Sequence, residues 1–174
     1  MGVIYICPLA DLHVHAAAFG PSHVISMLGN DPFPETPAGI AAGQHLRLRF
    51  HDIDAPQDGM LPPEPRHIEA ILRFGVDWAG RGPAIVHCYA GVSRSTAAAL
   101  TLIAQANPGH EAAAARLLRE RAPHAKPNRL MIRLADEALG LRGRLSDAVA
   151  AMGEPDFTGV GCLVEMPARF GTRQ

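Results

Sequence analysis

The sequence has few of the features that mark secreted, membrane-bound or nucleic-acid-binding proteins. Three cysteines in 174 residues are too few for a disulfide framework, and they favour a reducing cytoplasm. No apolar run reaches the roughly 20 residues of a membrane-spanning helix, and the first residues lack the charged region of a secretory signal. The formal net charge of −1 makes nucleic acid and anionic membranes unexpected partners. A composition that is 48% hydrophobic and 19% charged indicates an ordinary domain with one sizeable core.

The most informative stretch is residues 87–95, which read His-Cys-Tyr-Ala-Gly-Val-Ser-Arg-Ser. The apolar residues 84–86 before it predict a short buried strand, and residues 96–104 after it predict a buried helix. A loop between a strand and a helix aims backbone N–H groups and the helix N-terminus at one point, which makes an anion site. The residue at the centre of this predicted site is a thiol, Cys88.

This stretch resembles the His-Cys-x5-Arg-Ser/Thr motif of the cysteine-dependent protein tyrosine phosphatases. Five positions match it: His87, Cys88, Gly91, Arg94 and Ser95. The resemblance covers about residues 3–139, and the chain looks most like a small bacterial protein of the tyrosine- or dual-specificity-phosphatase type. The family's phosphate-binding loop would correspond here to Tyr89, Ala90, Gly91, Val92, Ser93 and Arg94.

The matched residues suit phosphoryl transfer chemically. A thiol beside a helix N-terminus and a cation ionises more readily than a free cysteine, and only the thiolate is a good nucleophile. Arg94 offers a planar fork of donors for two phosphoryl oxygens, and Gly91 permits a positive φ. Ser95 can donate its hydroxyl to the sulfur, and His87 is expected to orient Cys88. The resemblance implies a two-step hydrolysis through a cysteinyl-phosphate, with no metal or other cofactor.

The resemblance also implies an aspartate general acid on a loop about thirty to forty residues before the cysteine. Residues 45–50 alternate between apolar and polar, as a strand does, and they lead into a Pro/Gly-rich loop with three aspartates. Asp52, at the end of the predicted strand, is the first candidate, Asp54 is the second and Asp58 is the third. The remaining carboxylates are expected to be surface groups with turn roles.

A second similarity to dual-specificity phosphatases lies in residues 121–128, Arg-Ala-Pro-His-Ala-Lys-Pro-Asn. In that family the asparagine opens a helix and braces the phosphate loop, a role that would fall here to Asn128. Pro127 stops any preceding helix, and asparagine is a good N-cap, so simple capping of a helix over residues 129–139 is the alternative.

Strands that alternate with helices predict an α/β fold with a central, mostly parallel sheet of four to five strands flanked by helices. Residues 1–152 are assigned to one phosphatase-like catalytic domain, and residues 153–174 to a C-terminal tail of unknown role. A short helix is predicted for residues 21–28, because Pro21 and Ser22 suit a helix start. Further strands are expected over residues 2–7 and 45–50, and further helices over 66–79, 110–121, 129–139 and 142–152.

Residues 11–15, Asp-Leu-His-Val-His, support a rival hypothesis. This pattern ends the first strand of metal-dependent amidohydrolases, and on a strand His13 and His15 face the same side, as two metal ligands must. That family needs a barrel of about 250 residues, for which this chain is too short.

Other interpretations of Cys88 are a sulfurtransferase, an arsenate reductase, or a pseudophosphatase that binds phosphate without turnover. His87 and Ser95 fit phosphoryl transfer better than the first two, and the intact Cys88 and Arg94 argue against the third. Substrate choice follows from the loop side chains at positions 89, 90, 92 and 93, which are all uncharged. They favour a phosphorylated protein or a small phosphomonoester over a highly anionic lipid.

The two other cysteines, Cys7 and Cys162, are candidates for a protective disulfide with an oxidised Cys88.

Overall fold

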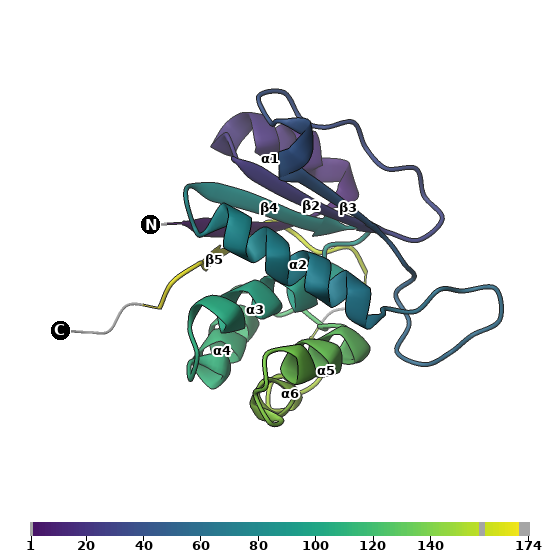
Figure 1. The fold of residues 1–174 in the computed structure, drawn as a ribbon, viewed down its shortest axis with the longest axis vertical. Helices are drawn as coiled ribbons and strands as arrows, with labels where there is room; N and C mark the ends of the chain where they lie inside the picture. The colour runs from purple at the N-terminus through teal and green to yellow at the C-terminus, as the bar shows by residue number, and fades with distance from the viewer. Residues whose placement is uncertain (1, 157–158, 171–174) are drawn as a thin grey trace.

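The computed structural model describes residues 2–156 and 159–170, and a five-stranded sheet forms its centre (Figure 1). The strand order is β3-β2-β4-β1-β5; the first four are parallel to their neighbours, whereas β5 runs antiparallel to β1. The mostly parallel sheet of four to five strands is therefore confirmed. The strands are β1 (Val3–Pro8), β2 (His23–Leu28), β3 (His45–Arg49), β4 (Pro83–Cys88) and β5 (Val164–Pro167).

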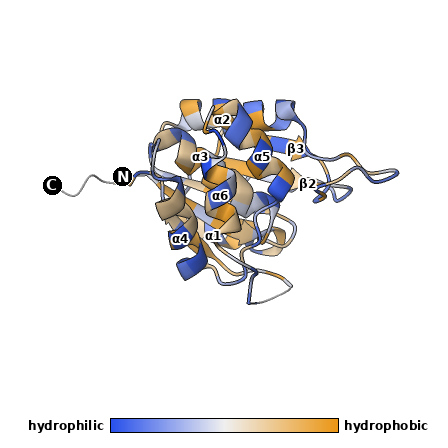
Figure 2. Cartoon of the chain, turned by 90° about the horizontal axis from the view of Figure 1, so that it is seen from below, coloured by the Kyte–Doolittle hydropathy of each residue, from blue (hydrophilic) through white to orange (hydrophobic). Residues whose placement is uncertain are grey.

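Helices cover the two faces of the sheet unequally (Figure 1). α1 (Leu12–Phe19) lies on one face, above a small apolar cluster that includes Cys7, Val24 and Ile85, and the short 3₁₀ helix η2 (Ala42–Gln44) lies on the same side (Figure 1). The larger core lies on the other face, and Figure 2 shows hydrophobic strands together with helices that carry both hydrophobic and hydrophilic residues. The helices on this side are α2 (Pro65–Trp78), α3 (Arg94–Ala106), α4 (Glu111–Arg121), α5 (Arg129–Ala138) and α6 (Arg144–Ala150).

The parallel strands bring separate loops to one edge of the sheet. β1, β2, β3 and β4 run in the same direction, so their carboxyl ends lie at the same edge, where ligands bind in open α/β sheets. The loop after β4 is residues 89–93, and it leads directly into α3. The loop after β3 carries the three candidate aspartates. The topology therefore places the predicted nucleophile loop and the predicted acid loop at the same edge.

The predicted helix over residues 21–28 is wrong, because His23–Leu28 form β2. β2 lies between β3 and β4, and its residues from Val24 to Leu28 are buried. A strand that is covered on both faces is an unbroken apolar run, which periodicity does not distinguish from a buried helix.

The expected placement of residues 11–15 on a strand end or loop is also wrong. Asp11 ends a 3₁₀ helix (Leu9–Asp11), and His13 and His15 lie in α1. Residues two positions apart in a helix point about 200° apart around its axis, so these two imidazoles do not share a face as co-ligands would.

The segment after Met152, predicted only as a tail, contributes to the sheet. Residues 164–167 form β5, which pairs with β1 from Val3 to Ile6. Val164 and Met166 of this strand are buried in the core. Within residues 2–156 and 159–170, no helix is both long enough and apolar enough to cross a bilayer.

Candidate active site

The thiol of Cys88 lies at the carboxyl end of β4 and is 2% exposed. Its Sγ is 3.3 Å from Oγ of Ser95, which is the second residue of α3 and is buried. The serine hydroxyl is therefore in position to donate a hydrogen bond to a thiolate, as the sequence predicted. The cysteine faces the larger core, on the side of the sheet that α3 covers.

The loop after Cys88 is held by its carbonyl groups. The oxygens of Tyr89 and Ala90 accept from the N–H groups of Leu9 and Gly161, at 3.1 and 2.8 Å. The carbonyl oxygen of Val92 accepts from the N–H of Lys126 at 3.0 Å.

Ser93 is held in the same way, and its carbonyl accepts from the N–H groups of Ala97 and Asn128. By contrast, none of the N–H groups from Ala90 to Ser93 donates to another of the described residues. Unpartnered N–H groups on a loop that ends at a helix N-terminus are what an anion site requires.

Gly91 is required for two separate reasons. Its φ is +71°, a conformation that side chains with a Cβ adopt only with strain. A Cβ at this position would also lie 2.7 Å from the nitrogen of Pro8 and 2.8 Å from the carbonyl carbon of Cys7. The sequence predicted the positive φ, and the structure adds a close approach of Gly91 to the end of β1.

Arg94, the first residue of α3, is only 6% exposed. Its Nη1 donates to the carbonyl of Phe50 at 2.8 Å, which fixes the guanidinium to the end of β3. Its Nε is buried and has no partner among the described residues. Because an unpaired buried donor costs roughly 1–3 kcal/mol, this nitrogen indicates a site built for an acceptor that arrives from solution.

His87 is buried, and its Nδ1 lies 3.4 Å from the carbonyl oxygen of Cys88. Burial lowers the pKa of His87 to about 4, so the imidazole is neutral near pH 7. This geometry agrees with the predicted orienting role and gives His87 no contact with the sulfur.

Asp52 is the aspartate that the fold brings to the loop. Its Oδ1 accepts from Oγ of Ser93 at 2.7 Å and from Nδ2 of Asn128 at 2.9 Å. Asn128 also caps α5, since its Oδ1 accepts from the N–H of Met131 at 2.9 Å, so capping and bracing occur together. The contact between Ser93 and Asp52 was not predicted, and no spacing rule would have identified it.

Asp54 and Asp58 are exposed, and neither makes a side-chain hydrogen bond to the described residues. Asp54 lines a depression of about 610 Å³ beside the loop, together with Asp52, Ser93 and Asn128. A second depression, of about 300 Å³, lies between Asp52, Tyr89 and Arg94. Asp52 borders both depressions, which favours it over the other two candidates.

The largest surprise near the loop is the segment that follows residue 158. Gly161 donates its N–H to Ala90, and a Cβ on Gly161 would lie 2.7 Å from Nε2 of His124. Such close packing admits only glycine. The one available signal was the glycine itself, in a stretch that showed no periodic pattern.

Cys7 is buried on the opposite face of the sheet, in the cluster beneath α1, whereas Cys88 belongs to the larger core. Burial raises the pKa of Cys7 to about 12, so it stays a neutral thiol. Cys162 is exposed, one residue after Gly161. Disulfide formation with Cys88 remains a prediction for both.

The described residues hold no cluster of three or more His, Cys, Asp or Glu side chains arranged as metal ligands. His13 is exposed, and the ring of His15 stacks on Phe19 at a centroid distance of 5.8 Å. The stacking gives His15 a local packing role within α1.

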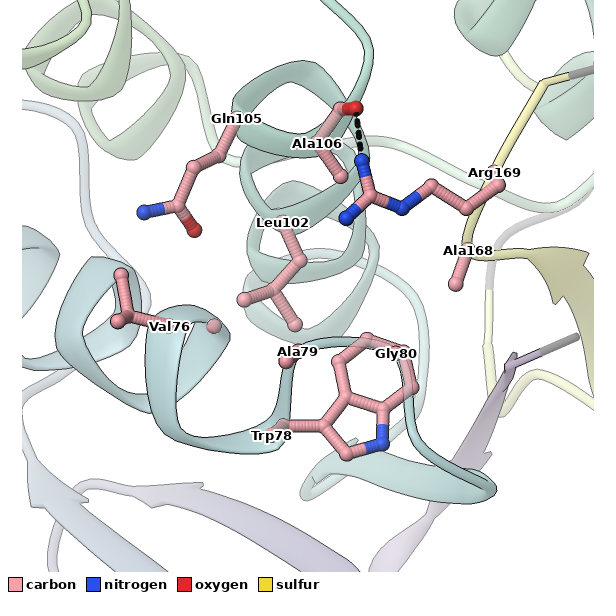
Figure 3. A pocket seen from close by; sticks show the side chains of 10 residues that line it. Val76, Trp78, Ala79, Gly80, Leu102, Gln105, Ala106, Ala168 and Arg169 are labelled. Carbon is pink, nitrogen blue, oxygen red and sulfur yellow. Dashed lines mark hydrogen bonds between the residues drawn. The ribbon is translucent and has the colours of Figure 1, made fainter.

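Another pocket, of about 260 Å³, lies at the opposite end of α3 (Figure 3). It is lined by Trp78, Leu102, Gln105 and Arg169 among others, and it contains none of the predicted site residues. The catalytic candidates therefore gather at the amino end of α3 alone.

No family model matches the sequence, and no curated protein matches it. Solved structures do match the fold. Human DUSP28 is 17% identical, with a TM-score of 0.56, over 86% of this chain and 92% of that one. The human tyrosine phosphatase-like serine/threonine/tyrosine-interacting protein has the same score and identity over 80% and 92%. PTPMT1 in complex with PI(5)P is 14% identical, with a TM-score of 0.55, over 84% and 90%. The chain therefore has the fold of the dual-specificity and tyrosine phosphatases.

Proposed function

We propose that this protein is a phosphomonoester hydrolase of the tyrosine-phosphatase type that works through a cysteinyl-phosphate. One observation carries the proposal: a buried thiol and a buried guanidinium Nε flank a loop whose N–H groups at residues 90–93, like that Nε, have no partner among the described residues. Donors that are fixed in advance stabilise the charge of a phosphoryl transition state without reorganisation.

In the first step, Sγ of Cys88 attacks phosphorus. The S–P bond forms while the P–O bond to the leaving group breaks, and Asp52 transfers its proton to the departing oxygen. Arg94 and the loop N–H groups bind the equatorial oxygens throughout. Asp52 is the preferred acid because it borders both depressions and is held by Ser93 and Asn128.

In the second step, water attacks the phosphorus of the cysteinyl-phosphate and the S–P bond breaks. Asp52, now ionised, takes the proton from that water, and phosphate is released. The hydroxyl of Ser95, 3.3 Å from the sulfur, stabilises the departing thiolate. The reaction consumes one water and leaves the enzyme unchanged.

The substrate we propose is a phosphotyrosine protein or another monophosphate ester, handled in a reducing cytoplasm. The side chains of residues 89, 90, 92 and 93 carry no charge that would bind additional phosphates. Tyr89, which is 56% exposed at the rim of the smaller depression, offers an aromatic face to a substrate ring. PTPMT1, a structural neighbour, was solved with PI(5)P, so a phosphoinositide belongs in the substrate panel.

The test is turnover of para-nitrophenyl phosphate, phosphotyrosine peptide, phosphoserine peptide and phosphoinositide by the wild type and by Cys88→Ser. We expect the wild type to hydrolyse the aryl phosphates, vanadate to inhibit it, and Cys88→Ser to be inactive. Cys162→Ser is the matched control, because this cysteine is exposed and lies outside the loop. A wild type as inactive as Cys88→Ser, but still able to bind vanadate, would support the alternative of a phosphate-binding pseudophosphatase.

A further inference from the structure

A buried chain of polar side chains crosses the sheet on the face that α1 covers. Ser26 of β2 lies directly beside His87 of β4 in the ladder, and both are 0% exposed. Oγ of Ser26 is 2.5 Å from Nε2 of His87 and 2.7 Å from Nε2 of His45, which belongs to β3 and is 5% exposed. One hydroxyl therefore joins two imidazoles from the neighbouring strands on either side.

The chain continues from His45 to the surface. Nδ1 of His45 is 3.0 Å from Oγ1 of Thr36, in the loop between β2 and β3. Nη2 of Arg47 donates to that same oxygen at 2.8 Å. At the other end, Nδ1 of His87 lies 3.4 Å from the carbonyl of Cys88. Five hydrogen bonds thus connect an exposed arginine to the backbone of the candidate nucleophile.

The chemistry of the two ends fixes the direction of every bond between them. A guanidinium only donates and a carbonyl only accepts. Thr36 accepts from Arg47 and donates to Nδ1 of His45, which leaves the proton of His45 on Nε2. Oγ of Ser26 accepts a hydrogen bond from the Nε2–H of His45, and its hydroxyl donates a hydrogen bond to Nε2 of His87. The proton of His87 then lies on Nδ1, pointing at the carbonyl of Cys88.

The reverse direction leaves groups unmatched. With its proton on Nε2, His87 would turn the lone pair of Nδ1 toward the carbonyl lone pairs of Cys88, which repel it. Arg47 and His45 would both donate to the oxygen of Thr36, so the hydroxyl proton of Thr36 would have to go to solvent. Unmatched polar groups in a buried network are costly. Burial lowers the pKa of both His45 and His87 to about 4, and both rings are therefore neutral, as the ordered chain requires.

We infer that Thr36, His45 and Ser26 are positioning residues, which act through His87 to hold the peptide of Cys88 in place for catalysis. The inference rests on the proposed function. The bond from His87 to the carbonyl is long and therefore weak by itself. The series of hydrogen bonds matters because it fixes the tautomer and the plane of the His87 ring, which meets this carbonyl. Small displacements of a reacting group lower the rate of reaction.

The positive groups that face the two imidazoles come from three elements. They are the guanidinium groups of Arg47 on β3 and Arg94 on α3 and, when it is protonated, the imidazole of His13 on α1. Each disfavours a charge on the imidazole that it faces. These groups lie on both faces of the sheet and favour the neutral forms of His45 and His87.

Nitrogen-15 NMR of the imidazoles tests the ordered chain without reference to activity. We expect His87 to carry its proton on Nδ1 and His45 to carry its proton on Nε2 near pH 7. Thr36→Val, which removes only the hydroxyl, should change the tautomer balance of His45, whereas Thr36→Ser should preserve it. An Nε2 tautomer for His87 in the wild type would overturn the inference.

Kinetics in a Cys162→Ser background test whether this series of hydrogen bonds affects the reactivity of Cys88. We expect Ser26→Ala, which removes two buried hydrogen bonds, to lower kcat by about tenfold. Thr36→Val removes the bond to His45 and should lower kcat by roughly threefold, and KM should change little in both variants. Thr36→Ser should restore kcat. The rate of Cys88 alkylation by iodoacetamide as a function of pH should shift in Ser26→Ala and Thr36→Val but not in Thr36→Ser.

The outcomes separate the two proposals. If both variants keep wild-type kcat, alkylation profile and tautomers, the positioning role is wrong while the hydrolase assignment survives. If the wild type hydrolyses no phosphomonoester but shows the expected tautomers and the altered alkylation in Thr36→Val, the proposed function fails and the ordered chain stands.

Discussion

The two ends of α3 contrast in how they use their polar groups. At the amino end, Arg94 keeps a buried Nε without a partner, and the loop N–H groups before it donate to none of the described residues. At the carboxyl end, the buried Asn107 is fully engaged: Nδ2 donates to the carbonyls of Ile103 and Ala168, and Oδ1 accepts from the N–H of Phe170. Arg169 donates to the carbonyl of Ala106 at 2.6 Å (Figure 3).

The contrast indicates which end of α3 is the candidate anion-binding site. Native structures pair nearly all buried polar groups, so the unpaired ones call for an explanation. The polar side chains that line the pocket at the carboxyl end of α3 already have partners, and they are Trp78, Gln105 and Arg169. Nδ1 of His110, just beyond α3, is also buried without a partner among the described residues, but it is a single atom outside that lining. At the amino end, the Nε of Arg94 and the N–H groups of residues 90–93 have no partner among the described residues, and they lie in the same short segment as the buried thiol of Cys88. A bound anion would satisfy them.

After the loss of activity expected for Cys88→Ser, the largest effect is expected at Asp52. Asp52→Asn should lower kcat by roughly 10²–10⁴, because an amide is far too weak an acid to protonate the leaving group. Asp54→Asn and Asp58→Asn are the matched controls, since both aspartates lie on the same loop and are exposed. Rates for para-nitrophenyl phosphate decide the assignment, and equal small losses in all three variants would remove Asp52 from the mechanism.

Arg94→Lys should lower kcat/KM by roughly 10²–10³, because lysine cannot present two parallel donors to a phosphoryl group. It should also weaken the inhibition of the enzyme by vanadate. Arg129→Lys, an exposed arginine at the edge of the larger depression, is the control and should change kcat/KM little. Similar losses of kcat/KM in both variants would show that catalysis depends on positive charge in general and not on the two parallel donors of the buried Arg94 guanidinium.

Gly91→Ala should destabilise the fold by roughly 1–3 kcal/mol and reduce activity, because strain at positive φ adds to the overlap with the backbone of β1. Gly59→Ala measures the cost of the positive φ alone, since Gly59 has a φ of +74° and a Cβ there would meet nothing within 4 Å. Urea unfolding of both variants should give the smaller loss for Gly59→Ala. Equal losses would mean that the contact with β1 adds no cost.

The buried imidazoles predict a loss of stability in acid. His45 and His87 take up protons near pH 6.5 in the unfolded chain but only near pH 4 in the folded one. The free energy of unfolding should therefore be highest above about pH 7 and fall as the pH decreases from 6.5 to 4. Urea midpoints at pH 7 and pH 5 measure the change. His45→Gln should narrow the difference, and an unaltered difference would contradict the contribution of His45.

The smallest effect is expected at the carboxyl end of α3. Arg169→Met should leave kcat/KM unchanged and cost less than about 1 kcal/mol of stability, because it removes one exposed hydrogen bond. A marked loss of activity in Arg169→Met would show that the two ends of α3 are coupled, and the simple contrast between them would then fail.

Local sequence pattern correctly predicted a strand, a loop and a helix around residues 88–94, the seven consecutive positions that hold Cys88, Gly91 and Arg94. It failed for β2, where a proline and a serine before an apolar run suggested a helix start. The deciding factor there was burial between β3 and β4, which no local pattern contains. The role of Gly161 was likewise hidden, since it depends on Ala90, which lies far away in the sequence.

By itself, the sequence determined the chemistry available to this protein: one thiol, one guanidinium and one flexible glycine at fixed spacing, held between a strand and a helix. The tertiary structure decided which other groups serve that loop. It brings Ser93 and Asn128 to the carboxylate of Asp52, and this contact is why we propose Asp52 over Asp54 and Asp58 as the acid. It also lined up Ser26, His45 and Thr36 behind His87. Hydrogen bonds across a sheet join residues that the chain keeps apart, so only the pairing of the strands could select them.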